Sequence, residues 1–114
     1  MNAPKRGEIW LLDLNTENKI TNSRAKTKTC LCLVVSTEAG EYDHALASVL
    51  PHSTVPRNTR FEVEVAARSL PHGGVFDAQC LVTVPLARFE RKIALVTLDD
   101  MERVDTALMF WLGL

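Results

Sequence analysis

The stretch Ala45-Leu46-Ala47-Ser48-Val49-Leu50-Pro51-His52-Ser53-Thr54 decides how this chain folds. Residues 45–50 form a short apolar run that is typical of a strand. Downstream, Phe61-Glu62-Val63-Glu64-Val65 alternates apolar and acidic side chains, which indicates a half-buried strand. The polar residues between the two are therefore predicted to lie at a strand end, on a connection whose side chains can meet a ligand while the sheet holds the backbone.

This connection gathers an imidazole, two hydroxyls and two guanidiniums: His52, Ser53, Thr54, Arg57 and Arg60. Such groups suit an anionic substrate and proton transfer, as in phosphodiester chemistry. The plain alternative is a surface turn, in which Pro51 ends the strand and the hydroxyl side chains form the turn. The residue types alone do not decide between a site for an anionic substrate and a surface turn.

Size and charge narrow the class of protein. A chain of 114 residues predicts a single domain over residues 1–114, and the net charge of −1 excludes a strong global attraction to nucleic acid or membrane. Basic residues are nevertheless concentrated between Glu17 and Glu38, where no acid interrupts them: Lys19, Arg24, Lys26 and Lys28. A locally basic but globally neutral chain is compatible with a small polyanion site.

The chain has three cysteines, an odd number, and no secretion signal, so we expect a cytoplasmic protein with reduced thiols. It has no apolar run of about 20 residues, so we expect no membrane span. Cys30 and Cys32 lie on one strand face, and zinc sites usually need two pairs at wider spacing, so we expect structural cysteines and no metal. No glycine-rich nucleotide loop is present, and we expect no cofactor.

The hydrophobic pattern predicts six strands, over residues 8–14, 30–36, 45–50, 60–65, 75–84 and 89–96. Asp77 and Gln79 share one face of the fifth strand. Residues 15–29 form a connection longer than usual, which favours a functional loop.

A helix is predicted after Thr97, which with Asp100 resembles a capping box, and Gly113 is expected to end it. Its apolar stripe comprises Leu98, Met101, Val104, Leu108 and Trp111. Many short strands followed by one amphipathic helix predict a mainly β fold, a small bent sheet or open barrel with the helix packed on it.

The last helical turn is apolar nearly all round, because Met109, Phe110 and Leu112 lie off the main stripe. Such a turn must bury both sides, which predicts a subunit interface or a partner that binds in a groove. We expect a homodimer contact that involves this helix, through Phe110 and Trp111, or the adjacent barrel. Trp10 and Trp111 are expected in a core rather than on a base-stacking surface.

Several motifs resemble the MazF/PemK toxin family, in order and over nearly the whole chain. They are Arg6-Gly7-Glu8-Ile9-Trp10, Leu33-Val34-Val35-Ser36, Val49-Leu50-Pro51-His52-Ser53-Thr54, Arg60-Phe61-Glu62-Val63, Gly74-Val75-Phe76-Asp77-Ala78-Gln79, Leu81-Val82-Thr83-Val84-Pro85, residues 104–108 and Trp111-Leu112-Gly113-Leu114. The resemblance implies an SH3-like barrel that forms homodimers. It also implies a metal-independent endoribonuclease that cuts single-stranded RNA such as mRNA at short sequences, inhibited by a cognate antitoxin.

The resemblance implies attack of a ribose 2′-OH on the adjacent phosphate, with Ser53 on the family's catalytic threonine. His52 is expected to carry the proton because an imidazole does so near neutral pH, although the family generally has an apolar residue there. The family's Arg-Pro pair is missing, since Cys30-Leu31 stands there. Its cation would come from Lys28, Arg24 or Arg57. RNA contacts are expected from Lys19, Arg24, Lys26, Thr54, Arg60, Asp77 and Gln79.

Two other functions stay open. The ending Trp111-Leu112-Gly113-Leu114 also resembles that of CcdB, a non-enzymatic toxin on the same fold that poisons DNA gyrase. The departures from the family pattern further allow a catalytically weakened member that keeps the dimer and the antitoxin contact.

Overall fold

The computed structural model describes residues 3–14, 29–66, 70 and 73–114, and the structural statements below concern these residues. In chain order the elements are β1 (Glu8–Asp13), β2 (Thr29–Val34), β3 (Leu46–Ser53), β4 (Glu62–Glu64), β5 (Val75–Asp77), the 3-10 turn η1 (Ala78–Cys80), β6 (Val82–Pro85), the 3-10 turn η2 (Leu86–Arg88), β7 (Phe89–Leu95) and α1 (Leu98–Leu112). The predicted content, short strands and one C-terminal helix, is confirmed.

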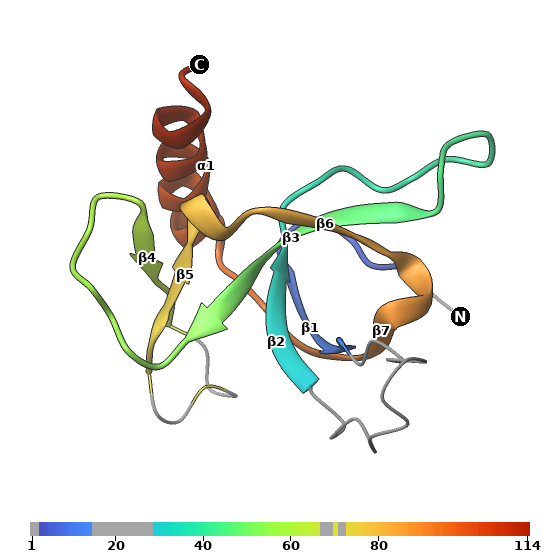
Figure 1. Cartoon of the computed structure of the whole chain (residues 1–114), viewed down its shortest axis with the longest axis horizontal. Helices are drawn as coiled ribbons and strands as arrows, with labels where there is room; N and C mark the ends of the chain where they lie inside the picture. Colours follow the sequence, from blue (N-terminus) through green and yellow to red (C-terminus); the bar gives the residue numbers. More distant parts are fainter. Residues whose placement is uncertain (1–2, 15–28, 67–69, 71–72) are drawn as a thin grey trace, which may run out of the picture.

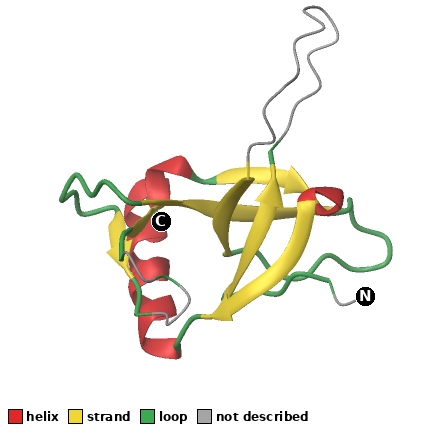
Figure 2. Cartoon of the chain, turned by 90° about the horizontal axis from the view of Figure 1, so that it is seen from below, coloured by secondary structure: helices red, strands yellow, loops and turns green. Residues whose placement is uncertain are grey.

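The strands of the described residues form one antiparallel sheet in the order β4-β5-β3-β2-β1-β7, and β6 adds to β3 beside this path. The sheet bends strongly, and α1 stands against the end that carries β4 and β5 (Figures 1 and 2). The sheet is not closed, yet its curvature gives the barrel-like mainly β fold that the sequence predicts. No helix in the described part of the chain is long and apolar enough to cross a membrane.

Strand alternation splits the apolar side chains of the central strands between two cores. Ile9, Leu33 and Leu50 point toward α1 and pack with its Met101 and Val104. Their strand neighbours point to the opposite face and form the second core, which comprises Trp10, Leu12, Cys32, Val34, Ala47, Val49, Val84 and Phe89. The central strands are buried on both sides, as their continuous apolar runs predict.

Strand β3 extends three residues beyond the predicted end at Leu50. On one edge it pairs with β6 through residues 46–49, and further along it pairs with β5 through His52 and Ser53. Pro51 lies between these two partners, where a residue without an N–H disturbs the ladder least. The expectation that His52 and Ser53 lie on a connection was therefore wrong, since β5 continues the sheet beside them.

The single strand predicted over residues 75–84 was also wrong, because η1 divides it into β5 and β6. Asp77 starts this turn by accepting a hydrogen bond from the Gln79 amide at 2.9 Å. The Ala78 amide donates to the Phe61 carbonyl at 2.8 Å, a contact from a distant segment that no local pattern reveals.

Helix α1 begins and ends as predicted. The Thr97 hydroxyl accepts a hydrogen bond from the Asp100 amide at 3.2 Å, and Gly113 ends the helix in the left-handed region. The apolar stripe is only partly buried: Leu98 is 85% exposed, because this first residue precedes the turn that meets the sheet. Trp10 is buried as expected, but Trp111 is 44% exposed, so its assignment to a core was wrong.

Candidate functional site

The end of β3 presents Ser53 at the surface of the sheet. Ser53 is half-buried, and its Oγ accepts a hydrogen bond from the Val55 amide at 3.2 Å and donates to the Val55 carbonyl at 3.4 Å. These two contacts form a local turn that leads the chain out of the strand. The hydroxyl is therefore accessible, with no buried partner to displace before it meets a ligand.

His52 is fixed on the other face of the same strand end. Its Nε2 lies 2.9 Å from the Gly73 carbonyl oxygen, and its ring packs at a tilt on Phe76 with the centroids 5.2 Å apart. Because a carbonyl only accepts, Nε2 carries the proton in this bond, and Nδ1 is the nitrogen that a neutral imidazole offers to an incoming proton. The geometry leaves a proton-transfer role to Nδ1 alone.

Gly74 makes this arrangement possible. Its φ is +112°, and a Cβ at this position would lie 2.5 Å from both His52 Nε2 and the Ser53 carbonyl oxygen. Only a residue without a side chain allows β5 to start so close to β3. The predicted motif Gly74-Val75-Phe76-Asp77 thus contributes backbone space as well as side chains.

Residues 54–61, which we call the β3–β4 loop, are held by Glu62. The Glu62 carboxylate accepts hydrogen bonds from the backbone amides of Arg57 (2.9 and 3.0 Å) and Thr59 (2.9 Å). Asn58 between them has a φ of +57° and also donates its amide to Glu62. The amides of Thr59 and Arg57, in that order, lower the pKa of Glu62, so the loop is closed around an ionised carboxylate.

A second group of polar residues lies at the end of β5, near Asp77. Glu62 and Asp77 are paired across β4 and β5. Burial first, and then the Asp77 carboxylate, raise the pKa of the exposed Cys80 thiol, whereas the charge of Arg57 lowers it. The Arg57 amide is bound to Glu62, Glu62 pairs with Asp77, and Cys80 lies on the turn that Asp77 starts. We call Arg57, Glu62, Asp77 and Cys80 the β5-end cluster, and the Gln79 side chain is exposed beside it.

The structure separates the β5-end cluster from the end of β3. Ser53 pairs with Val75, whereas Asp77 lies two residues further along β5, which is about 7 Å at the usual strand rise. Ser53 and His52 thus lie on opposite faces of the end of β3, and Arg57, Asp77 and Gln79 lie at another place in the sheet. The order of these residues in the sequence does not reveal this separation.

The predicted basic residues before β2 lie outside the described residues: Lys19, Arg24, Lys26 and Lys28. What the structure does describe is Thr29, the first residue of β2. Because β2 and β3 are antiparallel and Cys32 pairs with Pro51, the start of β2 and the end of β3 lie at the same end of the sheet. The half-buried Cys30 and the buried Cys32 face the second core, as structural cysteines do.

The remaining candidates lie on other surfaces. Thr54 is exposed in the β3–β4 loop. The Arg60 guanidinium lies over the Phe61 ring, 4.8 Å from its centroid, and Phe61 in turn meets Trp111 edge to face at 5.6 Å. The end of α1 is an exposed apolar surface, which we call the α1 tip: Met109, Phe110, Trp111, Leu112 and Leu114.

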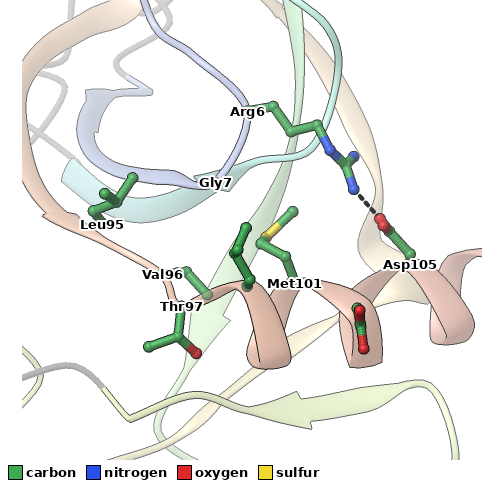
Figure 3. A pocket seen from close by; sticks show the side chains of 9 residues that line it. Arg6, Gly7, Leu95, Val96, Thr97, Met101 and Asp105 are labelled. Carbon is green, nitrogen blue, oxygen red and sulfur yellow. Dashed lines mark hydrogen bonds and ion pairs between the residues drawn. The ribbon is translucent and has the colours of Figure 1, made fainter.

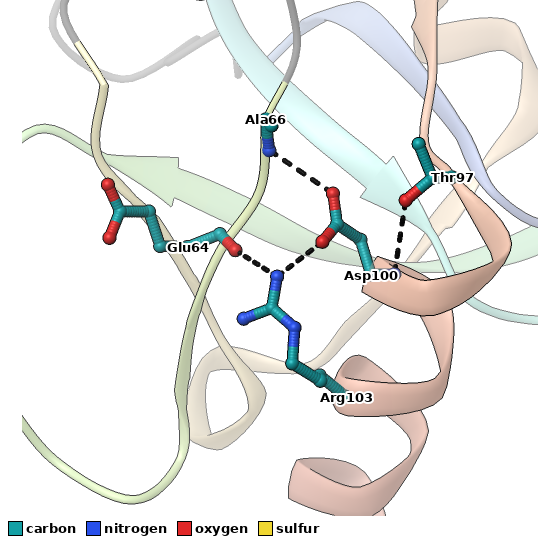
Figure 4. A network of polar contacts seen from close by, with 5 residues as sticks. All are labelled: Glu64, Ala66, Thr97, Asp100 and Arg103. Carbon is teal, nitrogen blue, oxygen red and sulfur yellow. Dashed lines mark hydrogen bonds and ion pairs between the residues drawn. The ribbon is translucent and has the colours of Figure 1, made fainter.

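A network of polar contacts attaches β4 to α1 (Figure 4). The buried Asp100 carboxylate accepts hydrogen bonds from the Ala66 amide at 3.2 Å and from Arg103, which also donates to the Glu64 carbonyl at 2.7 Å. Burial raises the pKa of Asp100, but the hydrogen bonds from Arg103 and Ala66 outweigh burial and hold this pKa below its ordinary value. This network keeps β4, and with it Glu62, in a fixed position.

A pocket of about 660 Å³ lies elsewhere, between the start of β1 and α1 (Figure 3). Leu95, Val96 and Met101 line it, and an ion pair of Arg6 with Asp105 crosses its rim. None of the predicted site residues lines this pocket. Among the described residues, no group of three or more His, Cys, Asp or Glu side chains could hold a metal ion.

Comparison with known proteins identifies relatives over the full length of the chain. The family model of the PemK-like, MazF-like toxin of type II toxin–antitoxin systems matches residues 5–112. No curated protein matches.

Solved structures agree with the family model. An endoribonuclease from Mycobacterial species is 27% identical, with a TM-score of 0.74 over 100% of this chain and 95% of that one. MazF from Deinococcus radiodurans is 21% identical, with a TM-score of 0.77 over all of both chains. In the MazE–MazF complex of the same organism the TM-score is 0.80 at 22% identity, over 99% of each chain. The last two likenesses show the fold alone.

Proposed function

The chain belongs to the PemK-like, MazF-like toxins of type II toxin–antitoxin systems, and on that premise we propose that it is an endoribonuclease that cleaves single-stranded RNA. The 27% identical mycobacterial structure, itself an endoribonuclease, supports this activity. An mRNA substrate places the activity in the cytoplasm. A cognate antitoxin is the second proposed partner, since another similar mycobacterial endoribonuclease is in complex with its own.

The observation that carries the proposal is that the end of β3 presents an accessible hydroxyl, and that the neighbouring residue on the opposite face is a fixed imidazole. Among the described residues, Ser53 Oγ makes only local contacts with Val55, and the Gly73 carbonyl holds His52 so that Nδ1 is the nitrogen available for a proton. Thr29, which follows the basic residues in the sequence, starts β2 at the same end of the sheet. Hydroxyl, imidazole and cation are the groups that phosphodiester cleavage needs.

In the proposed reaction the ribose 2′-oxygen loses its proton to a base and attacks the adjacent phosphorus. The bond from phosphorus to the 5′-oxygen breaks, and that oxygen takes up a proton. The products are a 2′,3′-cyclic phosphate and a 5′-hydroxyl, so neither a metal nor a cofactor is needed. Ser53 and His52 would move the protons, and a cation from Lys28, Arg24 or Arg57 would stabilise the charged phosphorane.

We propose that further side chains hold the RNA around this centre: Lys19, Arg24, Lys26, Thr54, Arg60, Asp77 and Gln79. The cations among them would contact phosphates, and the amide, carboxylate and hydroxyl would contact base edges. We also propose a homodimer in which Phe110 and Trp111 lie in the interface, because both side chains are exposed in the described chain.

The test is incubation with labelled single-stranded RNA in EDTA. We expect fragments with 5′-hydroxyl ends, and no cleavage of a DNA strand of the same sequence, because DNA lacks the attacking 2′-OH. Ser53→Ala combined with Arg57→Ala should lower kcat/KM about 10²-fold or more, since a proton-transfer group and a cation are both lost. Ser53→Thr, which keeps the hydroxyl, is the matched control, and unchanged cleavage by the double variant would remove both residues from the mechanism.

One observation favours a second candidate function, a CcdB-like poison of a protein target such as DNA gyrase. Trp111, Leu112 and Leu114 are exposed by 44%, 51% and 87%, as a protein-binding C-terminus requires. Intact RNA in the EDTA assay, together with inhibition of gyrase supercoiling, would support this function. Intact RNA and active gyrase, with antitoxin binding retained, would instead indicate a catalytically weakened family member.

A further inference from the structure

We propose that Glu62 is a positioning residue for RNA binding: by holding the β3–β4 loop it presents Arg57 to a phosphate that flanks the scissile one. This inference rests on the proposed ribonuclease function and adds to it the role of a residue that faces no reacting atom. Arg57 then contributes to substrate binding, while the cation at the scissile phosphate comes from Lys28 or Arg24.

The first support is the set of contacts that Glu62 makes. Both carboxylate oxygens accept from the Arg57 amide, and one also accepts from the Thr59 amide. The Thr59 carbonyl accepts a hydrogen bond from the Glu62 amide at 3.3 Å, and the Phe61 amide donates to the Thr59 hydroxyl at 3.3 Å. The loop between β3 and β4 is thus closed on a single side chain, although its own residues 54–60 are all exposed.

The second support is where the closed loop holds Arg57. The Arg57 amide is bound to the Glu62 carboxylate, and Glu62 pairs with Asp77 across β4 and β5, so the Arg57 backbone is held at the β5-end cluster. By the register of β5 this cluster lies about 7 Å beyond the level of Ser53. One phosphate group is too small to touch both places, whereas successive phosphates of an RNA strand can occupy them in turn.

The third support is the anchoring of β4. Arg103 donates to the Glu64 carbonyl and to Asp100, so the strand that carries Glu62 is attached to α1. The hydrogen bond from Ala78 to the Phe61 carbonyl attaches the loop's last residue to η1. Because β4 is fixed, the Glu62 carboxylate can hold the β3–β4 loop in one position. A cation on such a loop binds a phosphate more tightly, because its backbone is already ordered before the RNA arrives.

The experiment compares Glu62→Gln with Glu64→Gln. Both glutamates lie on β4 and both variants remove one negative charge, but only Glu62 accepts the loop amides. A purely electrostatic effect would tighten RNA binding equally in the two variants. Our proposal predicts that the two variants differ: Glu62→Gln weakens RNA binding about 10-fold, whereas Glu64→Gln leaves it unchanged or makes it slightly tighter.

Binding is measured by fluorescence anisotropy with an RNA whose cleavage-site 2′-OH is methylated, over a range of salt concentrations. Arg57→Ala and Glu62→Gln should each reduce the slope of log Kd against log salt by about 0.7–1, the value for one lost phosphate contact. Arg91→Ala, which removes an exposed cation from β7 at the other edge of the sheet, should leave the slope unchanged. On cleavable RNA, Glu62→Gln should raise KM about 10-fold with kcat nearly unchanged, as expected for a contact equal in ground and transition states.

The outcomes separate this inference from the proposed function. If wild type binds and cuts RNA but Glu62→Gln behaves like Glu64→Gln, the positioning role is wrong and the ribonuclease stands. The same holds if Glu62→Gln lowers kcat and leaves KM unchanged. If wild type neither binds nor cuts RNA, the proposed function fails, and this inference fails with it. The positioning role is supported if Glu62→Gln weakens RNA binding and Glu64→Gln does not. Glu62→Gln and Arg57→Ala should also show the same loss in the slope of log Kd against log salt.

Discussion

At the scale of single residues, Gly74 shows how tightly the backbone is packed around Ser53. A Cβ at this position would meet the ring of His52 and the carbonyl oxygen of Ser53 at 2.5 Å, well inside van der Waals contact. The imidazole can turn aside, but the strand carbonyl cannot. A side chain here must therefore push β5 away from the end of β3.

We predict that Gly74→Ala destabilises the protein by about 3 kcal/mol, from backbone strain at positive φ and from overpacking. Gly73→Ala is the matched control, because its φ is +64° but nothing lies within 4 Å of the added Cβ. Its cost should be about 1–2 kcal/mol, that of the left-handed conformation alone. Urea unfolding measures both, and equal losses would show that the contact with β3 is relieved at no cost.

At the scale of elements, the attachment of β4 to α1 depends on Asp100. This side chain accepts hydrogen bonds from Ala66 and Arg103, while Asp99 in the same helical turn is exposed. Both carboxylates interact favourably with the helix N-terminus. A comparison of the two therefore separates the attachment from the effect of charge at the helix end.

Asp100→Asn should lower the free energy of unfolding by about 2 kcal/mol, since a buried charge-assisted contact is lost. Asp99→Asn should cost no more than about 0.5 kcal/mol. Chemical denaturation at neutral pH is the measurement. Equal effects of the two variants would mean that the network of Figure 4 does not stabilise the fold.

Because of Asp100, we predict that the free energy of unfolding falls at acidic pH. Burial raises the pKa of Asp100, but hydrogen bonds from Arg103 and Ala66 more than offset it, so the folded state releases this proton more readily than the unfolded chain does. Its stabilisation is complete above the unfolded value of about 3.9 and is lost as pH falls through the lower folded pKa. Wild type should therefore lose more stability than Asp100→Asn over this range in urea titrations. Parallel pH profiles would contradict the prediction.

The elements also show what a sequence can reveal. The alternation of Ile9 with Trp10 and Leu12 and the caps at Thr97 and Gly113 are local patterns, and β1 and α1 follow from them. The break at η1 could not be predicted, because it depends on the contact of Ala78 with Phe61 from a distant segment. Glu62 was missed for a similar reason. In the alternating stretch it resembles any exposed acid, and its role depends on how Asn58 turns the loop back on it.

At the scale of the whole molecule, the α1 tip predicts how copies of the chain associate. Phe110 is 59% exposed, next to an exposed Trp111. A charge introduced there must remain in water, and it therefore opposes association.

We predict that wild type sediments as a dimer and that Phe110→Glu sediments as a monomer in analytical ultracentrifugation. Leu98→Glu is the matched control, because it adds the same charge to an exposed leucine at the other end of α1. It should leave the dimer intact. Two dimeric variants would locate the interface away from the α1 tip.

The pairing of β1 with β7 has a consequence for how the protein is made. Glu8 lies opposite Leu95, and Ile9 packs in the core that α1 covers, so the first strand needs partners from the last segment of the chain. During translation the N-terminal strand emerges long before those partners. A ribosome must therefore translate past Leu95 before the native sheet can assemble, and until then the nascent chain carries no finished site.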